Sequence, residues 1–303
     1  MDKIKSPLSP EIRGMLLVFI GGVFWGFSGA CGQYIFMNKN VGADFLVPYR
    51  LFFAGSFILL YYIISGKSID IRVFKNKTDF MYLISYAVLG ILLTQYSYFY
   101  GIELSNAAVA TVIQYTAPIF IVLIVCYNEK RKPTKFEIIA LCLVVFGTML
   151  LATNGDITKL VLSPYALFIC FLSAIGTIFY NMLPIGINKK YDPVLMLGYA
   201  MIIVGVFMCF YNGVYKISVK VDMELVLAML GVIVFGTVFA FGFYMLGLRE
   251  IGPAKASLIS SIEPISAAFF SYAWLGSEFG FWQMWGFVFI MLAILLIYFT
   301  KKA

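Results

Sequence analysis

Two ionisable residues lie within long apolar stretches of the sequence. Glu263 lies near the middle of the stretch 253–275, and Arg50 lies within 43–65. A charge at the centre of a bilayer costs about 2.5–3.5 kcal/mol, so such a group indicates a functional site. We interpret Glu263 as a carboxylate that binds protons or an amine, and Arg50 as a group that recognises a carboxylate. The structural alternatives are a hydrogen-bonded carboxylate beside Pro264, and an arginine that reaches the membrane surface or pairs with a carbonyl or with Glu263.

Polar side chains accompany two prolines with the same spacing. Gln114 and Pro118 are four residues apart, as are Ser260 and Pro264, so each pair shares one helix face. Proline frees the carbonyl four residues back, which predicts either a hinge or a fixed kink at each proline. Polar groups within a membrane hold helices together or line a cavity. Because the helix face that carries the proline is polar in both predicted helices, we predict that Gln114 and Ser260 line a cavity.

Five further residues complete the predicted binding site. They are Trp25, Ser28, Gln95, Tyr98 and Asn181. Gln95 and Tyr98 are three residues apart and share a helix face. Trp25 lies too deep in its apolar stretch for the aromatic belt at a membrane surface. It either forms the wall of an apolar pocket or packs between helices.

Several kinds of chemistry find no support in the sequence. Histidine is absent, which removes the usual proton shuttle and the commonest metal ligand. The five cysteines fall in apolar runs without a C-x-x-C pair, as packing cysteines do. The segment 66–68 (Gly-Lys-Ser) lacks the earlier glycine of a phosphate-binding loop. We therefore predict no metal, no cofactor and no nucleotide.

The elements that must position these residues are membrane-spanning helices. The 303 residues are 62% hydrophobic and 12% charged, against about 25% charged in soluble domains. Because backbone polar groups in lipid must be satisfied internally, the apolar runs are predicted to be helices. Runs long enough to span a bilayer lie at 14–37, 43–65, 80–102, 105–127, 134–153, 163–185, 193–212, 223–248, 253–275 and 279–299.

Charge supports ten spans with both chain ends in the cytoplasm. With that topology, most of the 22 Lys and Arg residues fall on the cytoplasmic side, as membrane proteins prefer. The lysines placed outside are Lys39, Lys159, Lys216 and Lys220. Because the basic residues lie in short loops between apolar runs, the net charge of +7 does not indicate nucleic-acid binding.

The two halves of the sequence repeat. Residues 101–111 align with residues 247–257 at an offset of 146, which also places Pro118 on Pro264. Each repeat, 14–153 and 163–300, holds five predicted spans. Since five is odd, consecutive repeats must insert in opposite orientations. Inverted repeats are typical of secondary transporters, in which rocking opens a midplane site to either side.

The sequence resembles the EamA branch of the drug/metabolite transporter superfamily over nearly its whole length. The resemblance rests on Trp25–Gly29, Tyr49–Leu51, Leu104–Ala110, Gly252–Ser257 and Glu263–Pro264. The pattern is closest to carboxylate, amino acid and amine transporters. It implies a ten-helix fold and movement of amino acids or related metabolites, usually outward.

We therefore predict an all-α integral membrane protein of the cell's inner membrane, a secondary active transporter and not an enzyme. Its expected partners are a small-molecule solute, the lipid bilayer and protons, and its oligomeric state is left open. One alternative is a channel, receptor or scaffold without coupled transport. The other is a membrane enzyme that modifies lipid-linked substrates, which the sequence disfavours because it lacks histidine and aspartate-rich motifs.

Overall fold

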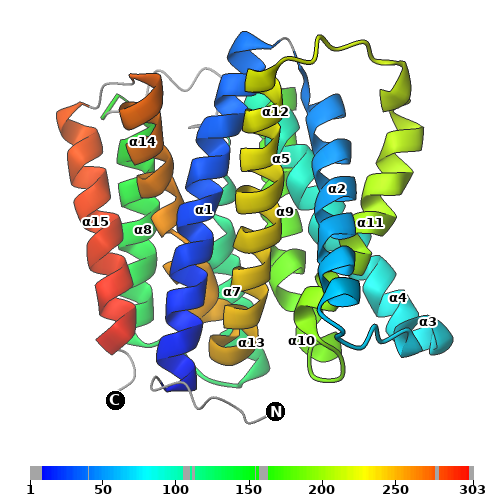
Figure 1. The fold of residues 1–303 in the computed structure, drawn as a ribbon. Coiled ribbons are helices and arrows are strands. Elements are labelled where there is room, and N and C mark those ends of the chain that lie inside the picture. The colour runs from blue at the N-terminus through cyan, green and yellow to red at the C-terminus, as the bar shows by residue number, and fades with distance from the viewer. Residues whose placement is uncertain are drawn as a thin grey trace.

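The computed structural model describes residues 9–39, 41–104, 110, 113–153, 155–156, 163–276 and 280–299. Within these ranges the chain is helical and has no strand (Figure 1). The helices are α1 (Pro10–Asn38), α2 (Ala43–Ile64), α3 (Arg72–Lys75), α4 (Lys77–Ser85), η1 (Tyr86–Leu92), α5 (Leu93–Leu104), α7 (Ala117–Asn128), α8 (Lys135–Thr153), α9 (Pro164–Met182), α10 (Pro184–Ile187), α11 (Pro193–Tyr211), η3 (Val214–Lys216), α12 (Met223–Leu230), η4 (Gly231–Phe239), α13 (Ala240–Ile259), α14 (Ile262–Leu275) and α15 (Phe281–Phe299).

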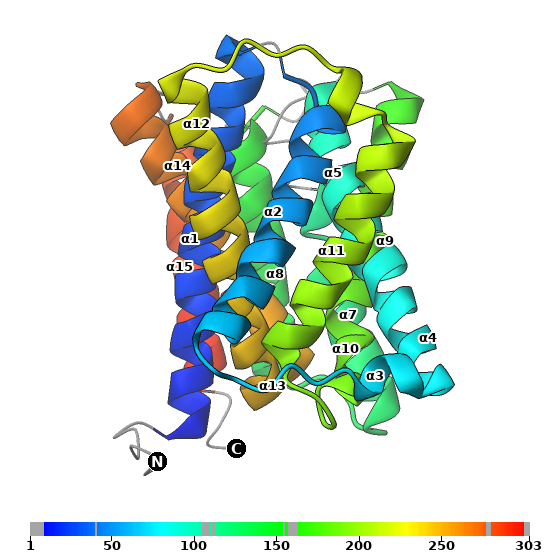
Figure 2. The ribbon, with the colours of Figure 1, turned by 45° about the vertical axis from the view of Figure 1, so that its right-hand side comes forward.

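The helices form a bundle in which the start of α1 and the end of α15 lie at the same end (Figures 1 and 2). Six helical segments of the described chain are long and apolar enough to cross a membrane. They are Pro10–Asn38, Ala43–Ile64, Lys77–Leu104, Pro164–Ile187, Pro193–Tyr211 and Met223–Ile259. The bundle also exposes many large apolar side chains, such as Phe57, Leu60 and Phe207. An apolar exterior of this extent requires a lipid covering.

The predicted all-α membrane class is thus confirmed. The ten crossings, the inverted five-helix repeats and the cytoplasmic chain ends stay predictions. Some residues on which these predictions rest lie outside the described part of the chain, namely Lys159 and the segments 105–109 and 111–112.

Several long helices begin with a side-chain cap followed by proline. The Ser9 hydroxyl accepts a hydrogen bond from the Ile12 amide at 3.3 Å, and Pro10 opens α1. Ser163 and Asp192 begin α9 and α11 in the same way. The capping oxygen satisfies an amide that has no partner within the helix, while proline has no amide to satisfy. These caps fix where the helices start.

Two π-helical segments interrupt long helices at matching places in the two halves. The segment η1 lies between α4 and α5, and η4 lies between α12 and α13. Adding the repeat offset of 146 to Tyr86–Leu92 gives 232–238, which falls within Gly231–Phe239. A π segment holds an extra residue in the turn and is often found at a functional site.

Gly252 marks the boundary that the sequence predicts between the spans 223–248 and 253–275. The element α13 consists of two helical segments that meet at a kink at Gly252, where φ is 79° and ψ is 166°. This conformation is open essentially to glycine alone. Pro253 follows and sets the backbone that continues towards the cavity described below.

Close packing of α1 against the second half depends on its glycines. A Cβ added at Gly22 would lie 3.2 Å from the Ser260 carbonyl oxygen, and one at Gly26 would lie 2.8 Å from the Glu263 carbonyl oxygen. Gly22 and Gly26 form a G-x-x-x-G pair, a pattern typical of closely packed membrane helices. The glycine face holds α1 directly against the backbone that carries Glu263.

Equivalent helices of the two halves form equivalent pairs. The helix α1 packs on α13 and η4, while α9 packs on α5 and η1. At the first crossing a Cβ on Gly21 would lie 2.8 Å from the Ala240 carbonyl; at the second, one on Gly176 would lie 2.5 Å from the Thr94 amide. Thr94 and Ala240 differ by the repeat offset. Two further pairs, α2 with α11 and α8 with α15, each join matching spans.

Ion pairs fasten both ends of α1 to the segment α12–α13. At one end Arg13 pairs with Glu250. At the other end the Lys39 ammonium lies 2.8 Å from Asp222 and 2.7 Å from Glu224. The hydrogen bond from Lys39 holds the pKa of Asp222 below its usual range. Because the two ends are tied to the same partner, α1 and α12–α13 form one packed unit.

We predict that Gly26→Ala destabilises the protein by about 1–3 kcal/mol, the usual cost of overpacking. The added methyl group would lie 2.4 Å from the Ala267 amide nitrogen, and backbone cannot turn aside as a side chain can. Gly29→Ala is the matched control in the same helix, because its methyl would meet only the Ala267 side chain at 4.0 Å. Thermal unfolding in detergent should give a lower midpoint for Gly26→Ala; equal midpoints for the two variants would contradict this packing.

Candidate functional site

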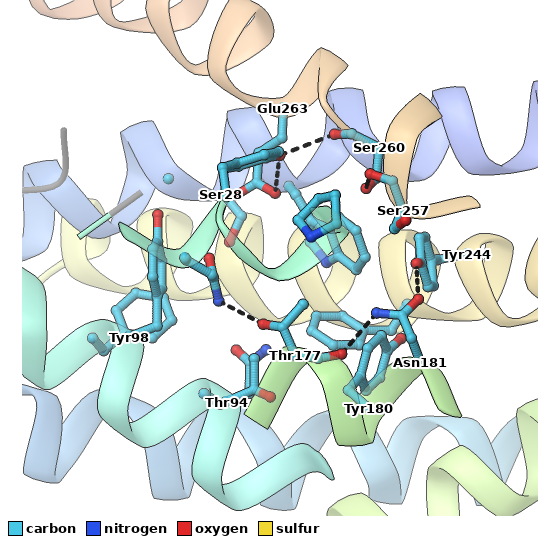
Figure 3. A pocket seen from close by; sticks show the side chains of 18 of the residues that line it. Ser28, Thr94, Tyr98, Thr177, Tyr180, Asn181, Tyr244, Ser257, Ser260 and Glu263 are labelled. Carbon is cyan, nitrogen blue, oxygen red and sulfur yellow. Dashed lines mark hydrogen bonds between the residues drawn. The ribbon is translucent and has the colours of Figure 1, made fainter. Parts of the chain in front are cut away.

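A cavity lies between the two halves of the chain, bounded by the middle of α1. The first half contributes Trp25, Ser28, Gly29, Arg50, Thr94, Gln95, Tyr98, Phe99, Gln114, Tyr115 and Pro118. The second half contributes Thr177, Tyr180, Asn181, Phe241, Tyr244, Ser257, Ser260 and Glu263. In Figure 3, Glu263 and Ser260 lie along one edge of the view, and Thr94 and Tyr180 along the opposite edge.

Every side chain predicted to bind the solute lies along this wall. These are Trp25, Ser28, Arg50, Gln95, Tyr98, Gln114, Asn181, Ser260 and Glu263. Pro118 lies in the wall as well, whereas Pro264 follows Glu263 in α14 and is not among the wall residues. The structure thus brings the predicted residues together, and their binding roles stay predictions.

Two helix breaks face the cavity. Residues 115–116 form a turn ahead of α7, and residues 260–261 form a turn between α13 and α14. The amides of Thr116 and Ser261 each donate to the carbonyl three residues back, at 3.1 and 3.2 Å. Such tight turns narrow the helix and leave carbonyls without their usual partners. The breaks occupy corresponding places in the two halves.

At each break a proline removes the amide that would normally donate to the carbonyl four residues back. Pro118 has no amide to donate to the Gln114 carbonyl, and Pro264 has none for the Ser260 carbonyl. The interruptions that the sequence predicts are therefore present at both prolines. Whether they move as hinges or stay fixed as kinks remains a prediction.

Tyr115 connects the two breaks. Its hydroxyl lies 3.1 Å from the Ser260 carbonyl oxygen and 3.3 Å from Oε2 of Glu263. The Ser260 carbonyl, which cannot accept from Pro264, therefore accepts from the Glu263 amide in its own half and from Tyr115 in the other half. Tyr115 is buried, with 6% of its surface exposed. Its hydroxyl is the hydrogen-bond donor that the structure gives to the Glu263 side chain.

Arg50 is buried against the cavity wall and does not extend to the surface. Its Nε donates to the Thr237 hydroxyl at 3.1 Å, and its guanidinium carbon lies 4.8 Å from the centre of the Phe99 ring. No carboxylate of the described chain, Glu263 included, lies within 4.0 Å of the guanidinium nitrogens. The alternatives of a surface-reaching arginine and of an ion pair with Glu263 are therefore wrong in this conformation. Most of the five guanidinium N–H donors are left for a ligand.

The π segment η4 orients the partner of Arg50. The Thr237 hydroxyl donates its own hydrogen to the Val232 carbonyl, five residues back, at 2.7 Å. Its oxygen lone pairs are then left to accept from Arg50. Thr237 is fully buried. The widened turn thus fixes the direction of the guanidinium.

The wall formed by α9 is a chain of hydrogen bonds. Gln114 donates from Nε2 to the Thr177 hydroxyl at 3.2 Å, across the two halves. Asn181 donates to the Thr177 carbonyl at 2.8 Å, and its side-chain oxygen accepts from the Tyr244 hydroxyl (Figure 3). Because these groups satisfy one another, this side of the cavity is rigid and polar.

Aromatic rings form the base of the cavity. The Trp25 ring centre lies 4.9 Å from those of Phe241 and Tyr244, and the Tyr180 ring centre lies 5.6 Å from that of Phe241. Both interpretations of Trp25 therefore hold, since its ring packs between helices and also lines the pocket. The Trp25 indole nitrogen and the Thr94 hydroxyl are buried without a hydrogen-bond partner among the described residues. Such groups are costly unless a ligand or water satisfies them.

The cavity holds one cationic and one carboxylate side chain, Arg50 and Glu263, among aromatic and neutral polar groups. A pocket with mostly apolar walls and a few convergent polar groups is typical of a small-molecule site. In the part of the chain that the structure describes, no three His, Cys, Asp or Glu residues are grouped to hold a metal ion.

The model of the EamA-like transporter family matches residues 12–153 and again residues 163–299. The chain belongs to this family. The two matches coincide with the two repeats that the internal offset of 146 indicates in the sequence.

One EamA relative is the uncharacterized inner membrane transporter YicL of Salmonella typhimurium. It is 33% identical over 285 residues, which cover 94% of this chain and 95% of the relative. A solved crystal structure has the same fold, with a TM-score of 0.77 at 12% identity, over 96% of this chain and 98% of the other. Together with the apolar helices, these relationships place the EamA protein in the inner membrane as a multi-pass protein.

Several wall residues of this EamA protein are missing from the site predicted from sequence. They are Gly29, Thr94, Phe99, Tyr115, Thr177, Tyr180, Phe241, Tyr244 and Ser257. Tyr115 directly follows Gln114, and Ser257 lies three residues before Ser260, so helical spacing gave a weak signal for both. For Phe241 and Tyr244 no such signal exists, since aromatic residues are frequent throughout the sequence.

We predict that Thr237→Val lowers the thermal midpoint in detergent. Valine has nearly the same shape but leaves Nε of the buried Arg50 without an acceptor, which costs about 1–3 kcal/mol. Thr237→Ser is the control, because it keeps the hydroxyl, and its thermal midpoint should fall less. If the valine variant is as stable as the serine variant, Thr237 does not hold Arg50.

Proposed function

We propose that this EamA protein is a secondary transporter that moves amino acids, or related small metabolites and amines, outward by alternating access. The observation that carries the proposal is the cavity between the two halves, whose wall contains both Arg50 and Glu263. Outward movement is the expectation from the family resemblance. The proposed activity involves no covalent chemistry.

Inverted repeats of five spans would supply the alternating access. Four features support this arrangement. The family match is duplicated, the helix breaks and the π segments recur at corresponding places, and α1 pairs with α13 as α9 pairs with α5. Two halves of similar structure can exchange conformations, and each exchange would open the shared cavity to the other side.

The membrane topology that we propose has ten crossings with both ends in the cytoplasm. The described helices fall within each of the ten apolar ranges of the sequence. The start of α1 and the end of α15 lie at one end of the bundle, as an even number of crossings requires (Figure 1). The distribution of Lys and Arg favours the cytoplasm for that end.

The cavity suits a zwitterion. Arg50 offers a planar set of donors that can bind both oxygens of a carboxylate. Glu263 would accept from an amine, and the rings of Trp25, Phe241 and Tyr244 would contact an apolar part of the solute. Because Arg50 and Glu263 come from opposite halves, a bound solute would bridge them.

Glu263 is the proposed coupling residue. A carboxylate that is protonated in one conformation and ionised in the other would link solute movement to a proton gradient. Exchange of solutes without protons would use the same cavity.

Counterflow in proteoliposomes tests the proposal. Liposomes loaded with amino acids and small amines should accumulate a labelled solute saturably, and unlabelled solute should compete. Uptake that does not saturate would indicate a channel, and binding without accumulation would indicate a receptor or scaffold. Either result would overturn the proposed function.

We predict that Arg50→Gln weakens the binding of amino acids more than the binding of their neutral amides in this assay. A hydrogen bond to a charged group contributes about 1.5–3 kcal/mol, which corresponds to roughly a 10- to 100-fold loss of affinity. Half-saturating concentrations for an amino acid and its amide, measured side by side, provide the comparison. An equal loss for both would mean that Arg50 supports the fold and does not recognise the carboxylate.

A further inference from the structure

One phenol faces two acceptors at the point where the two helix breaks meet. The Tyr115 hydroxyl is 3.1 Å from the Ser260 carbonyl oxygen and 3.3 Å from the Glu263 carboxylate. A phenol has one hydrogen to donate, so it cannot serve both acceptors fully. The Glu263 amide also donates to the Ser260 carbonyl, at 3.0 Å, and closes the turn at 260–261.

The protonation state of Glu263 decides which acceptor receives that hydrogen. An ionised carboxylate only accepts, and hydrogen bonds to charged groups are roughly twice as strong as neutral ones. It therefore draws the Tyr115 hydrogen away from the Ser260 carbonyl. A protonated Glu263 can donate instead to the phenol oxygen, and the phenol hydrogen then returns to the Ser260 carbonyl. No proton passes between the carboxyl group and the phenol, and only the direction of the hydrogen bond between them changes.

We infer that Tyr115 is the positioning residue through which protonation of Glu263 controls the contact between the two helix breaks. With Glu263 protonated, Tyr115 holds the turn at 260–261 to the turn at 115–116. With Glu263 ionised, that tie between the halves is released. The inference rests on the proposed transport function and assigns the residue that couples the proton to the movement.

Few other groups compete for this role. Besides Tyr115, the ionisable side chains that share the cavity with Glu263 are Arg50 from α2, Tyr98 from α5, Tyr180 from α9 and Tyr244 from α13. From α1 the cavity receives Trp25 and Ser28, which do not titrate. The sequence of α15 contains no Asp, Glu, Lys or Arg. Tyr244 donates to Asn181, and Arg50 to Thr237, so each of these has another partner.

Tyr115→Phe tests the inference, because it removes the hydroxyl and keeps the ring. In proteoliposomes the variant should lose the stimulation of counterflow by a pH gradient, expressed as its rate with the gradient relative to its own rate without one. Tyr82→Phe is the matched control: Tyr82 is 52% exposed on α4, away from the cavity, and its variant should respond to the gradient as the unchanged protein does.

The possible outcomes distinguish a failure of the proposed role of Tyr115 from a failure of the proposed transport function. Full gradient stimulation in Tyr115→Phe overturns the role of Tyr115 while transport stands. Counterflow in the unchanged protein without any gradient stimulation also overturns it. Absence of saturable counterflow in the unchanged protein overturns the proposed function itself.

Infrared spectroscopy provides a second test that does not depend on the folding of Tyr115→Phe. In the unchanged protein a tyrosine C–O band should shift over the pH range in which a carboxyl band appears. Both changes should be missing from Glu263→Gln, which isolates them from the other tyrosines. A carboxyl band that appears without any tyrosine shift would overturn the inference.

Discussion

The placement of a buried Arg50 and a half-buried Glu263 between apolar helices is the constraint on which the site depends. Neither side chain has the other as a direct partner, so the protein must satisfy each in a different way. Arg50 receives a hydroxyl and an aromatic face, and Glu263 receives a phenol. Both keep hydrogen-bonding capacity towards the cavity. A buried charge whose partners are incomplete is expensive, and a solute of opposite charge would complete them.

Backbone geometry makes this arrangement possible. Glycines on α1 allow it to approach the turn at 260–261, so that Glu263 projects from a broken helix beside the cavity. The break exists because Pro264 cannot donate to the Ser260 carbonyl, which accepts instead from the Glu263 amide and from Tyr115 of the other half. The hydrogen bond from Tyr115 thus joins the break in the first half to the break in the second half. That bond is why a change at one break is felt at the other.

The sequence predicted which residues line the site better than it predicted which of them contact one another. Charge within apolar runs identified Arg50 and Glu263, and the repeat identified Gln114 and Ser260, because both signals are local. The bond from Tyr115 to Glu263 joins residues 148 apart, and the bond from Arg50 to Thr237 joins residues 187 apart. Spacing along the chain does not reveal which helices are neighbours. The π segments were also missed, since one extra residue in a turn leaves the hydrophobic pattern nearly unchanged.

The central claim is that one cavity opens to both sides of the membrane. It is tested most directly by cysteine accessibility at Ser257, a buried wall residue, as Ser257→Cys with the five native cysteines replaced by serine. A membrane-impermeant maleimide would be applied to right-side-out and to inside-out vesicles. Our account predicts labelling from either side, slowed on both sides by a transported solute. Labelling from one side alone, with and without solute, would contradict it.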